Sequence, residues 1–345
     1  MLLQFPEIHD IAFQLPIAKH LGLGFSLTPY SSVGYRMKQE VDDDEIWGNI
    51  GRVQYQWDGD GDVTEVKLGL GWEIFRGFSI GIAAQYYWGD IQRIYKTAIL
   101  ENITGGGLIA DATGTETYSV SRFKGQFGVQ WSPISNRRRI LTIGATYDIG
   151  GDLNPNVTTK VQTGDIFNTV AMDMGNRLGL KLPQQVAVGM YYNTPKIAVG
   201  ADYVYQDWRS GNSRLVEKSA AGFDVAYRNT NTVKLGVEYT PNKADVRSAL
   251  KRWSYRAGVR YGTYNQTFGG VDVNEYAVTL GVGIPLTVLG GILGASSVDL
   301  GVEVGGRGSF KAINEQVSLV KQTYCKFSLG VTLFGDYWFV RPKYD

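Results

Sequence analysis

Apolar residues alternate strictly with small or polar residues through most of the chain. Between positions 255 and 261, for example, Tyr255, Ala257, Val259 and Tyr261 alternate with arginine and glycine. The same rule holds for later and earlier segments: 276–284, 298–304, 66–74, 78–88, 141–147, 186–192, 197–205 and 233–239. A period of two residues is typical of a β-strand whose two faces meet different surroundings, and no helical period competes with it. The pattern therefore predicts an all-β protein.

The two faces of these strands differ in a way that indicates their surroundings. The apolar face ends in aromatic residues such as Trp72, Trp88 and Trp131, as in the interfacial girdles of membrane barrels. The other face is rich in Gly, Ala and Ser with isolated charges, which suits a wet, crowded lumen. A soluble sandwich would instead carry Lys, Glu and Thr on its outer face. We therefore predict a transmembrane antiparallel β-barrel, with residues 1–345 as its single domain, in preference to a soluble all-β protein.

Short and long connections alternate between these strands, as periplasmic turns and extracellular loops do in bacterial outer-membrane barrels. The long polar connections are expected at about 30–62, 100–118, 151–170, 209–228, 263–271 and 309–317. Thirteen strands are expected, at 8–18, 21–30, 63–75, 78–99, 119–132, 138–150, 171–193, 196–208, 230–240, 252–263, 272–285, 296–308 and 318–335.

An odd number of strands contrasts with the even number of bacterial single-chain barrels. One further strand upstream of Met1 would give about 14 strands. It would also explain why the first residues, MLLQFPEIHD, show no secretory signal. The alternative is a hairpin within 34–58 that pairs as an extracellular extension.

The composition excludes several classes of protein. There are 44 Gly and 21 Tyr among 345 residues, but only 2 His and 1 Cys, which leaves little material for a metal centre, a disulfide framework or a cysteine nucleophile. The 34 basic and 33 acidic residues nearly balance, so no basic patch for nucleic acid is implied. No apolar run is long enough for a transmembrane helix. We therefore expect no enzymatic activity, cofactor, metal or nucleic-acid partner.

Several segments resemble the FadL-type outer-membrane transporter family: 21–37, 180–208, 233–241, 253–262, 281–286 and 298–309. The C-terminal segment 324–345 is similar to the versions found in Bacteroidetes-type bacteria. The resemblance implies a barrel of about 14 strands in the bacterial outer membrane, plugged by an N-terminal hatch and open to the bilayer through a lateral gap. The chain departs from this family at its start, because no hatch segment precedes the first alternating strand and the Asn-Pro-Ala signature is absent. The nearest string, Asn154-Pro155-Asn156, falls in an expected loop.

Two functions stay open at this stage. The resemblance implies a passive channel for hydrophobic small molecules such as long-chain fatty acids, with no chemical step. The alternative is an accessory or scaffold barrel subunit of an outer-membrane secretion or assembly complex. The expected partners are outer-membrane lipid and lipopolysaccharide, a hydrophobic ligand and, for the alternative, other envelope proteins.

Charged residues on the lumen-facing side of neighbouring strands are candidates for substrate binding. These candidates are Arg256, Arg260, Glu303 and Arg307, with Asp299 and Glu275 between them. An arginine pair could attract a fatty-acid carboxylate through charge-assisted hydrogen bonds. The alternative is an interior lattice of salt bridges, which any wide barrel is expected to contain.

The other chemistry-bearing residues favour structural roles. Asp58 to Asp62 has the D-x-D-x-D opening of a calcium loop, but Gly69 occupies the twelfth position, where an acidic ligand is needed; a solvated acidic loop is expected. His9 and His20 have no recognisable serine partner for an outer-membrane lipase. Cys325 is expected to face outward as a small hydrophobe.

Two connections at the expected periplasmic end are unusual. Arg137 to Arg139 forms a basic turn, expected to be solvated, with contact to a phosphate or lipid headgroup as the alternative. The connection Ile284 to Ala295 is too apolar for an ordinary turn. We expect it to dip into the membrane interface or to contact a partner.

Overall fold

The structure is a computed structural model and describes most of the chain. The described residues are 10–40, 51–102, 112–136, 138–153, 155–163, 166–171, 181–212, 217–218, 223–245, 247–286, 296–309, 311–313, 319 and 321–332. His9, Arg137, residues 287–295 and any hatch before Asp10 lie outside these ranges, and so do the expectations made for them.

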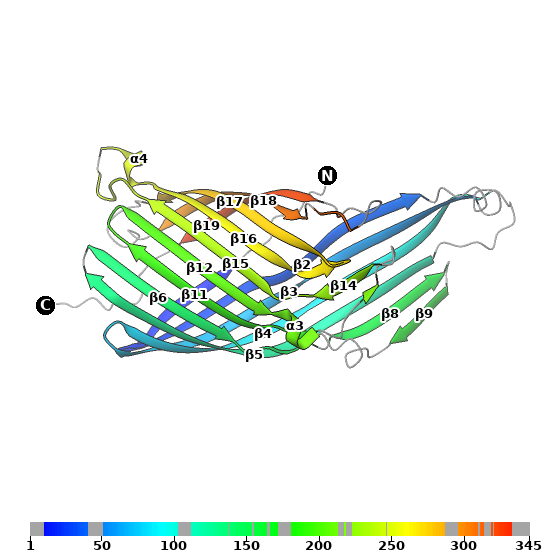
Figure 1. The fold of residues 1–345 in the computed structure, drawn as a ribbon, viewed down its shortest axis with the longest axis horizontal. Coiled ribbons are helices and arrows are strands. Elements are labelled where there is room, and N and C mark those ends of the chain that lie inside the picture. The colour runs from blue at the N-terminus through cyan, green and yellow to red at the C-terminus, as the bar shows by residue number, and fades with distance from the viewer. Residues whose placement is uncertain are drawn as a thin grey trace.

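The wall of the molecule is one antiparallel sheet that curls into an elongated barrel of tilted strands (Figure 1). In the described residues the sheet has 17 strands, and thirteen of them form the wall, each paired with the next, as the alternation predicts. In order they are β1 (Ile11–Ala18), β2 (Leu21–Glu40), β3 (Gly51–Phe75), β4 (Phe78–Asn102), β5 (Ala112–Asn136), β6 (Arg139–Asp148), β11 (Gln184–Asn193), β12 (Ile197–Asp207), β15 (Thr230–Tyr239), β16 (Ser254–Phe268), β17 (Val271–Pro285), β18 (Ser297–Gly308) and β19 (Gln322–Thr332).

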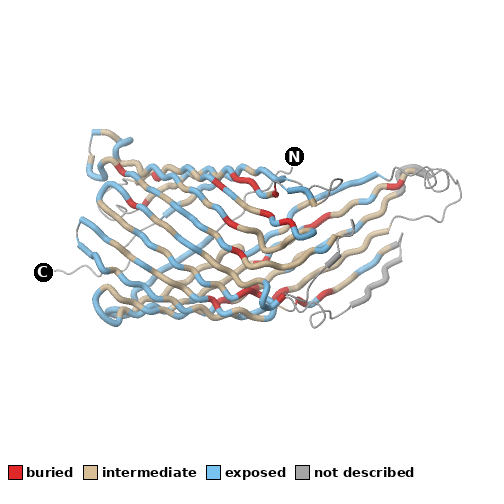
Figure 2. The backbone as a smooth tube through the Cα atoms, in the orientation of Figure 1, coloured by how far each residue is buried: buried red, intermediate tan, exposed pale blue. Residues whose placement is uncertain are grey.

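The faces of the barrel are the reverse of those of a soluble protein. Large apolar side chains point outward and stay exposed, among them Leu280 at 63%, Leu329 at 71% and Phe327 at 77%. Each such side chain would gain about 1.5–3 kcal/mol on leaving water, so the exterior is suited to lipid. Most of the buried segments lie between the middle of the barrel and the end from which long strands emerge (Figure 2). The fold is therefore a transmembrane β-barrel.

Four strands extend far beyond the barrel wall. β2 has 20 residues and β3, β4 and β5 have 25 each, whereas about 9–11 suffice to cross a bilayer. β8 (Asn156–Thr163) pairs with the outer part of β5, and β9 (Ile166–Ala171) pairs with β8. Together they form the projecting sheet at the right of Figure 1.

The projecting sheet corrects the expectation of long loops at 30–62 and 100–118. β2 and β3 stay paired as far as Glu40 and Gln54, so the hairpin considered within 34–58 exists as a continuation of both strands. The expected loop at 263–271 is also wrong, because β16 and β17 meet in a two-residue turn. Gly269 and Gly270, with φ of 57° and 76°, supply the positive φ that such a turn requires.

Glycine allows β3 and β4 to approach closely where they leave the wall. Gly61 has φ of 112° and Gly89 has φ of 148°, a region that L side chains rarely adopt. A Cβ on Gly89 would lie 2.1 Å from the carbonyl oxygen of Asp62, and one on Gly61 would lie 2.1 Å from that of Asp90. Both contacts are with backbone, so neither position has room for a side chain.

Short elements complete the described chain. β7 (Gly151–Asp152) pairs with β10 (Lys181–Leu182), and β13 (Glu217–Lys218) pairs with β14 (Asp224–Tyr227), which also pairs with β16. The helices α3 (Trp208–Asn212) and α4 (Ala249–Arg252) lie at opposite ends of the barrel in Figure 1.

Neither of these helices, nor any other helical stretch within the described ranges, is long and apolar enough to cross a membrane.

Candidate functional site

A buried carboxylate organises the polar inner face of the barrel. Asp148, 3% exposed on β6, accepts hydrogen bonds from the side-chain amides of Gln85, Gln126 and Gln185, at 2.9, 2.9 and 3.1 Å. The register aligns Asp148 with Gln126 on one neighbouring strand and with Gln185 on the other. Three amide donors therefore compensate a charge that would be costly to bury alone.

The same row of hydrogen bonds continues across the next strands. The side-chain oxygen of Gln185 accepts from Gln206 at 2.7 Å. The side-chain oxygen of Gln206 in turn accepts from the indole of Trp208 at 2.9 Å and from the hydroxyl of Thr230 at 3.0 Å. We call this row, from Gln85 to Thr230, the glutamine belt. It ties six wall strands and the start of α3 together on one face.

An apolar cluster lies where the long strands leave the wall. It contains Val63, Tyr87, Val120 and Leu182, each at most 5% exposed, with Ile91 and Leu153 packed against it. Val63, Tyr87 and Val120 come from β3, β4 and β5, while Leu182 belongs to β10. We call this cluster the neck. It places apolar side chains on the inner face of the barrel, which is elsewhere small or polar.

Lys124 lies beside the neck. Its ammonium lies 5.8 Å from the centre of the Tyr87 ring, and the ring of Tyr30 packs edge-on against Tyr87 at 4.8 Å. An aromatic face attracts a cation at this distance, so a positive charge sits at the rim of an apolar region.

The charged residues considered above as candidates for substrate binding form a lattice on the inner face of β15 to β19. Arg256 donates to Glu238 at 2.7 Å and to Asp299 at 2.5 Å, so its guanidinium spans four strands. Gly283 leaves the room for this reach, because a Cβ there would lie 2.7 Å from the Asp299 carboxylate and 3.1 Å from Arg256.

The other two arginines are also paired. Arg260 donates to Glu303 at 3.0 Å and to the hydroxyl of Tyr324 at 2.8 Å, and that hydroxyl donates to Glu303 at 2.8 Å. Arg307 forms an ion pair with Glu275. The structure thus brings all six candidate residues into the interior lattice considered from the sequence. A role in substrate binding stays a prediction for each.

Arg307 has surroundings that the other arginines lack. Its guanidinium stacks 4.6 Å from the centre of the Tyr264 ring. It also borders a cavity of about 220 Å³ lined mainly by Tyr264, Phe268, Val273 and Leu319. Apolar walls with one cationic edge suit a molecule that has an apolar body and an anionic end.

The solvated acidic loop expected at Asp58 to Asp62 is wrong, and the calcium alternative finds no support in the described residues. These positions lie within β3, paired on both sides, and no cluster of metal-ligating side chains is present in the described part of the chain. Burial alone would raise the pKa of Asp58. Hydrogen bonds from Gln56 and Arg36, with the charges of Arg36 and Lys96, instead bring that pKa below its ordinary value of 3.8.

The other chemistry-bearing residues singled out from the sequence lie in turns or at exposed positions of the wall. His20 sits in the turn after β1 with φ of 69°, and its Nδ1 lies 2.6 Å from Glu73 rather than near a serine. Glu73 also accepts from the backbone N–H of Gly77 at 2.9 Å, so it joins two neighbouring turns. Cys325 is an exposed free cysteine on β19. Arg138 and Arg139 are exposed at the turn between β5 and β6.

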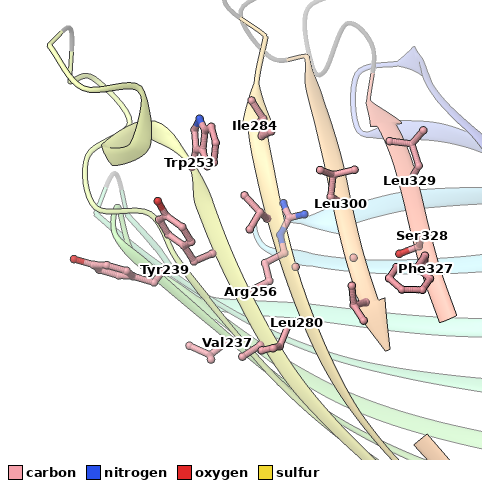
Figure 3. A pocket seen from close by; sticks show the side chains of 16 residues that line it. Val237, Tyr239, Trp253, Arg256, Leu280, Ile284, Leu300, Phe327, Ser328 and Leu329 are labelled. Carbon is pink, nitrogen blue, oxygen red and sulfur yellow. The ribbon is translucent and has the colours of Figure 1, made fainter. Parts of the chain in front are cut away.

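The outer face of β15 to β19 is hollowed into an apolar groove. It has a volume of about 1070 Å³, and most of its lining side chains point outward from these strands. In Figure 3, Tyr239 and Trp253 lie at the end beside α4, while Val237 and Leu280 lie farther along the barrel. Phe327 and Leu329 of β19 form the opposite border.

Alternation alone could not identify the glutamine belt, the neck or the groove. The inward-facing positions of the glutamines were the one feature of the sequence that could have pointed to the belt. Their convergence on Asp148 depends on pairings between residues up to 63 positions apart. Glu238 and Tyr324 were missed as lattice partners for the same reason.

Comparisons with known proteins agree on the fold. A FadL homologue of Pseudomonas aeruginosa aligns with a TM-score of 0.54 and 14% identity, over 94% of this chain and 78% of its own. The toluene transporter TbuX of Ralstonia pickettii aligns with a TM-score of 0.53 and 14% identity, over 94% of this chain and 80% of its own. The fold is therefore FadL-type. The family model BamG matches residues 4–345. No curated protein matches the chain.

Proposed function

The chain belongs to the BamG family, and from its fold and its apolar neck we propose that it is a passive channel for hydrophobic small molecules. Its place would be the outer membrane of a Gram-negative bacterium. The short turns would then face the periplasm and the projecting sheet would face outward, since outer-membrane barrels have short periplasmic turns and long extracellular loops.

The neck is the observation that carries this proposal. Val63, Tyr87, Val120 and Leu182 form a buried apolar cluster against the inner face of the wall, where a general water-filled pore would be polar. We infer that the lumen narrows at this cluster. An apolar constriction there would exclude water and ions by dewetting and would offer apolar solutes contacts that replace those they lose in lipid. Such passage needs no cofactor and no chemical step.

Among hydrophobic small molecules, we propose long-chain fatty acids as the substrate. The cavity beside Arg307 combines apolar walls with a guanidinium. Its pairing with Glu275 engages Nε, and a guanidinium has five N–H donors in all. A carboxylate could therefore bind there while the apolar tail extends along Phe268 and Leu319. The neighbour from Ralstonia pickettii, a toluene transporter, supports hydrophobic cargo in general.

Uptake into liposomes tests the proposal. We expect liposomes with the purified barrel to take up a labelled fatty acid and a labelled aromatic hydrocarbon faster than empty liposomes. Leu182→Arg, which places a charge in the neck, should lower both rates about ten-fold or more, as expected for placing an unpaired charge in apolar surroundings. Val161→Arg on the exposed face of β8 is the matched control and should leave uptake unchanged. Uptake no faster than that of empty liposomes would contradict the proposal.

An accessory role in an outer-membrane assembly or secretion complex is the second candidate. The glutamine belt favours it, because a continuous row of side-chain hydrogen bonds across six strands stiffens the wall more than a channel that opens requires. A stoichiometric complex with other envelope proteins, purified from native membranes, together with no uptake activity, would select this role. Uptake by the isolated barrel would select the channel.

A further inference from the structure

The apolar groove on the outer face is unusual for a barrel exterior, because a curved wall normally presents a convex surface to lipid. Its volume of about 1070 Å³ is at the upper end of the range of about 300–1,000 Å³ for small-molecule sites. The lining is almost wholly apolar, with Val237, Leu280, Leu300 and Leu329 among its side chains. Such a surface suits the acyl chains of a single bound lipid.

Aromatic and helical elements mark one end of the groove. Tyr239, Trp253 and Tyr255 line this end, and aromatic side chains of this kind settle at the level of lipid headgroups. The hydroxyl of Tyr255 donates to the backbone carbonyl of Leu250 at 3.0 Å, which holds α4 beside the groove (Figure 3). Whatever charge α4 carries is therefore held at the groove's end.

The connection between β15 and β16, which includes α4, is strongly basic. The connection from β15 to β16 contains Lys243, Arg247, Lys251 and Arg252 but a single acidic residue, Asp245. Asp245 is already engaged by Lys251 at 3.7 Å and by the backbone N–H groups of Arg247 and Ser248 at 2.9 and 2.8 Å. These two N–H groups and Lys251 also lower the pKa of Asp245, with Ser248 acting most strongly.

Three of the basic side chains keep their charge available. Within the described residues, Lys243, Arg247 and Arg252 have no carboxylate partner. Arg252 Nε is shielded from water and makes no hydrogen bond within the described chain. Basic residues at a membrane surface attract anionic headgroups, and an arginine binds a phosphate through paired N–H donors.

We propose that the groove is a binding site for one anionic phospholipid of the periplasmic leaflet. Its acyl chains lie against Val237, Leu280 and Leu300, and its phosphate lies over α4 against Arg247 and Arg252. The proposal rests on the outer-membrane orientation given above, which turns the α4 end of the barrel towards the periplasm. It is independent of whether the lumen conducts.

Lipid retention measures this site directly. The purified barrel is inserted into vesicles of phosphatidylethanolamine and phosphatidylglycerol, extracted in mild detergent and weighed by native mass spectrometry. We expect one phosphatidylglycerol to stay bound in preference to phosphatidylethanolamine. Lys243→Gln/Arg247→Gln/Arg252→Gln should lower its retention at least ten-fold, since each basic residue near an anionic surface contributes about five-fold.

A second variant tests the groove rather than the charge. Ala257 lines the groove and is exposed, so Ala257→Trp should fill it and displace the lipid without changing the charge. Ala145→Trp is the matched control, because Ala145 is aligned with the outward-facing Val129 and Val188 on another part of the wall. Arg138→Gln/Arg139→Gln is the matched control for charge at the same end.

Each outcome decides the proposal. Loss of phosphatidylglycerol in both groove and charge variants, with both controls retaining it, supports the site. Retention in Ala257→Trp, equal binding of phosphatidylethanolamine, or a second copy of the barrel in place of lipid overturns it. Fatty-acid uptake is measured separately on the same proteins. A barrel that conducts but retains no lipid would contradict the lipid-site proposal and leave the channel proposal standing.

Discussion

The barrel has two sides that use the same alternating pattern differently. In the projecting sheet of β2 to β5, β8 and β9, both polar and apolar residues are buried: Asp58 is 7% exposed and Val53 6%. On the side of β15 to β19, strands of 10–15 residues present apolar residues such as Phe327, 77% exposed. A strand that extends beyond the membrane must bury its apolar side chains against neighbouring strands. A strand within the membrane can instead present them to lipid.

The contrast extends to the forces that align the strands. The projecting sheet depends on backbone ladders, on close approach at Gly61 and Gly89, and on ion pairs such as that of Asp58 with Arg36 at 3.1 Å. The short strands are joined on their inner face by the arginine lattice. Substitutions on each side should therefore weaken different parts of the molecule.

The largest effect is expected at the point where the projecting sheet leaves the wall. Gly89→Val combines a φ of 148° with a backbone contact at 2.1 Å, and should lower the free energy of unfolding by about 4 kcal/mol. Urea unfolding of the detergent-folded barrel, followed by tryptophan fluorescence, measures it. Gly71→Val is the control, because nothing lies within 4 Å of a Cβ at that position. Equal stability of the two variants would show that the strands can separate here at little cost.

A smaller effect is expected from the lattice of the short strands. Gly283→Val would push the Asp299 carboxylate and the Arg256 guanidinium apart. It should cost about 1 kcal/mol, because both groups are partly exposed and solvent weakens their attraction. The same urea titration measures this loss against Gly24→Val, where a Cβ meets nothing within 4 Å. A double variant with Asp299→Asn should lose no more than Asp299→Asn alone; additive losses would exclude the ion pair as the cause.

The smallest effect is a pH dependence confined to the projecting sheet. The folded pKa of Asp58 lies below its ordinary value of 3.8, so its stabilising contribution is complete above that value and is lost as the pH falls through the lower folded pKa. The fluorescence of the neighbouring Trp57, obtained as the difference from Trp57→Phe, should change over this acidic range. In Asp58→Asn the change should be absent; its persistence would assign it to another carboxylate.

Part of this architecture could be predicted from local sequence. The two-residue period located the thirteen described strands, their outward faces and the lumen-facing parity of Arg256, Arg260, Glu303 and Arg307, because side-chain direction in a strand depends only on position along it. The pattern did not distinguish strand from loop at residues 30–40, 51–62 and 263–268, which were expected to be loops and lie in paired strands. These stretches are rich in glycine and in polar and charged residues, which suit a loop as well as a strand that extends into solvent.

The sequence by itself determined which residues face lipid and which face the lumen, since that choice requires only the contrast between adjacent positions. Tertiary structure decided which inward residues meet. Asp148 collects Gln85, Gln126 and Gln185 from three different strands, and Arg256 reaches Asp299 across β17. The same holds for the neck and for the groove beside α4. These contacts join residues far apart in the chain, so they depend on the register and curvature of the whole sheet, which no local pattern contains.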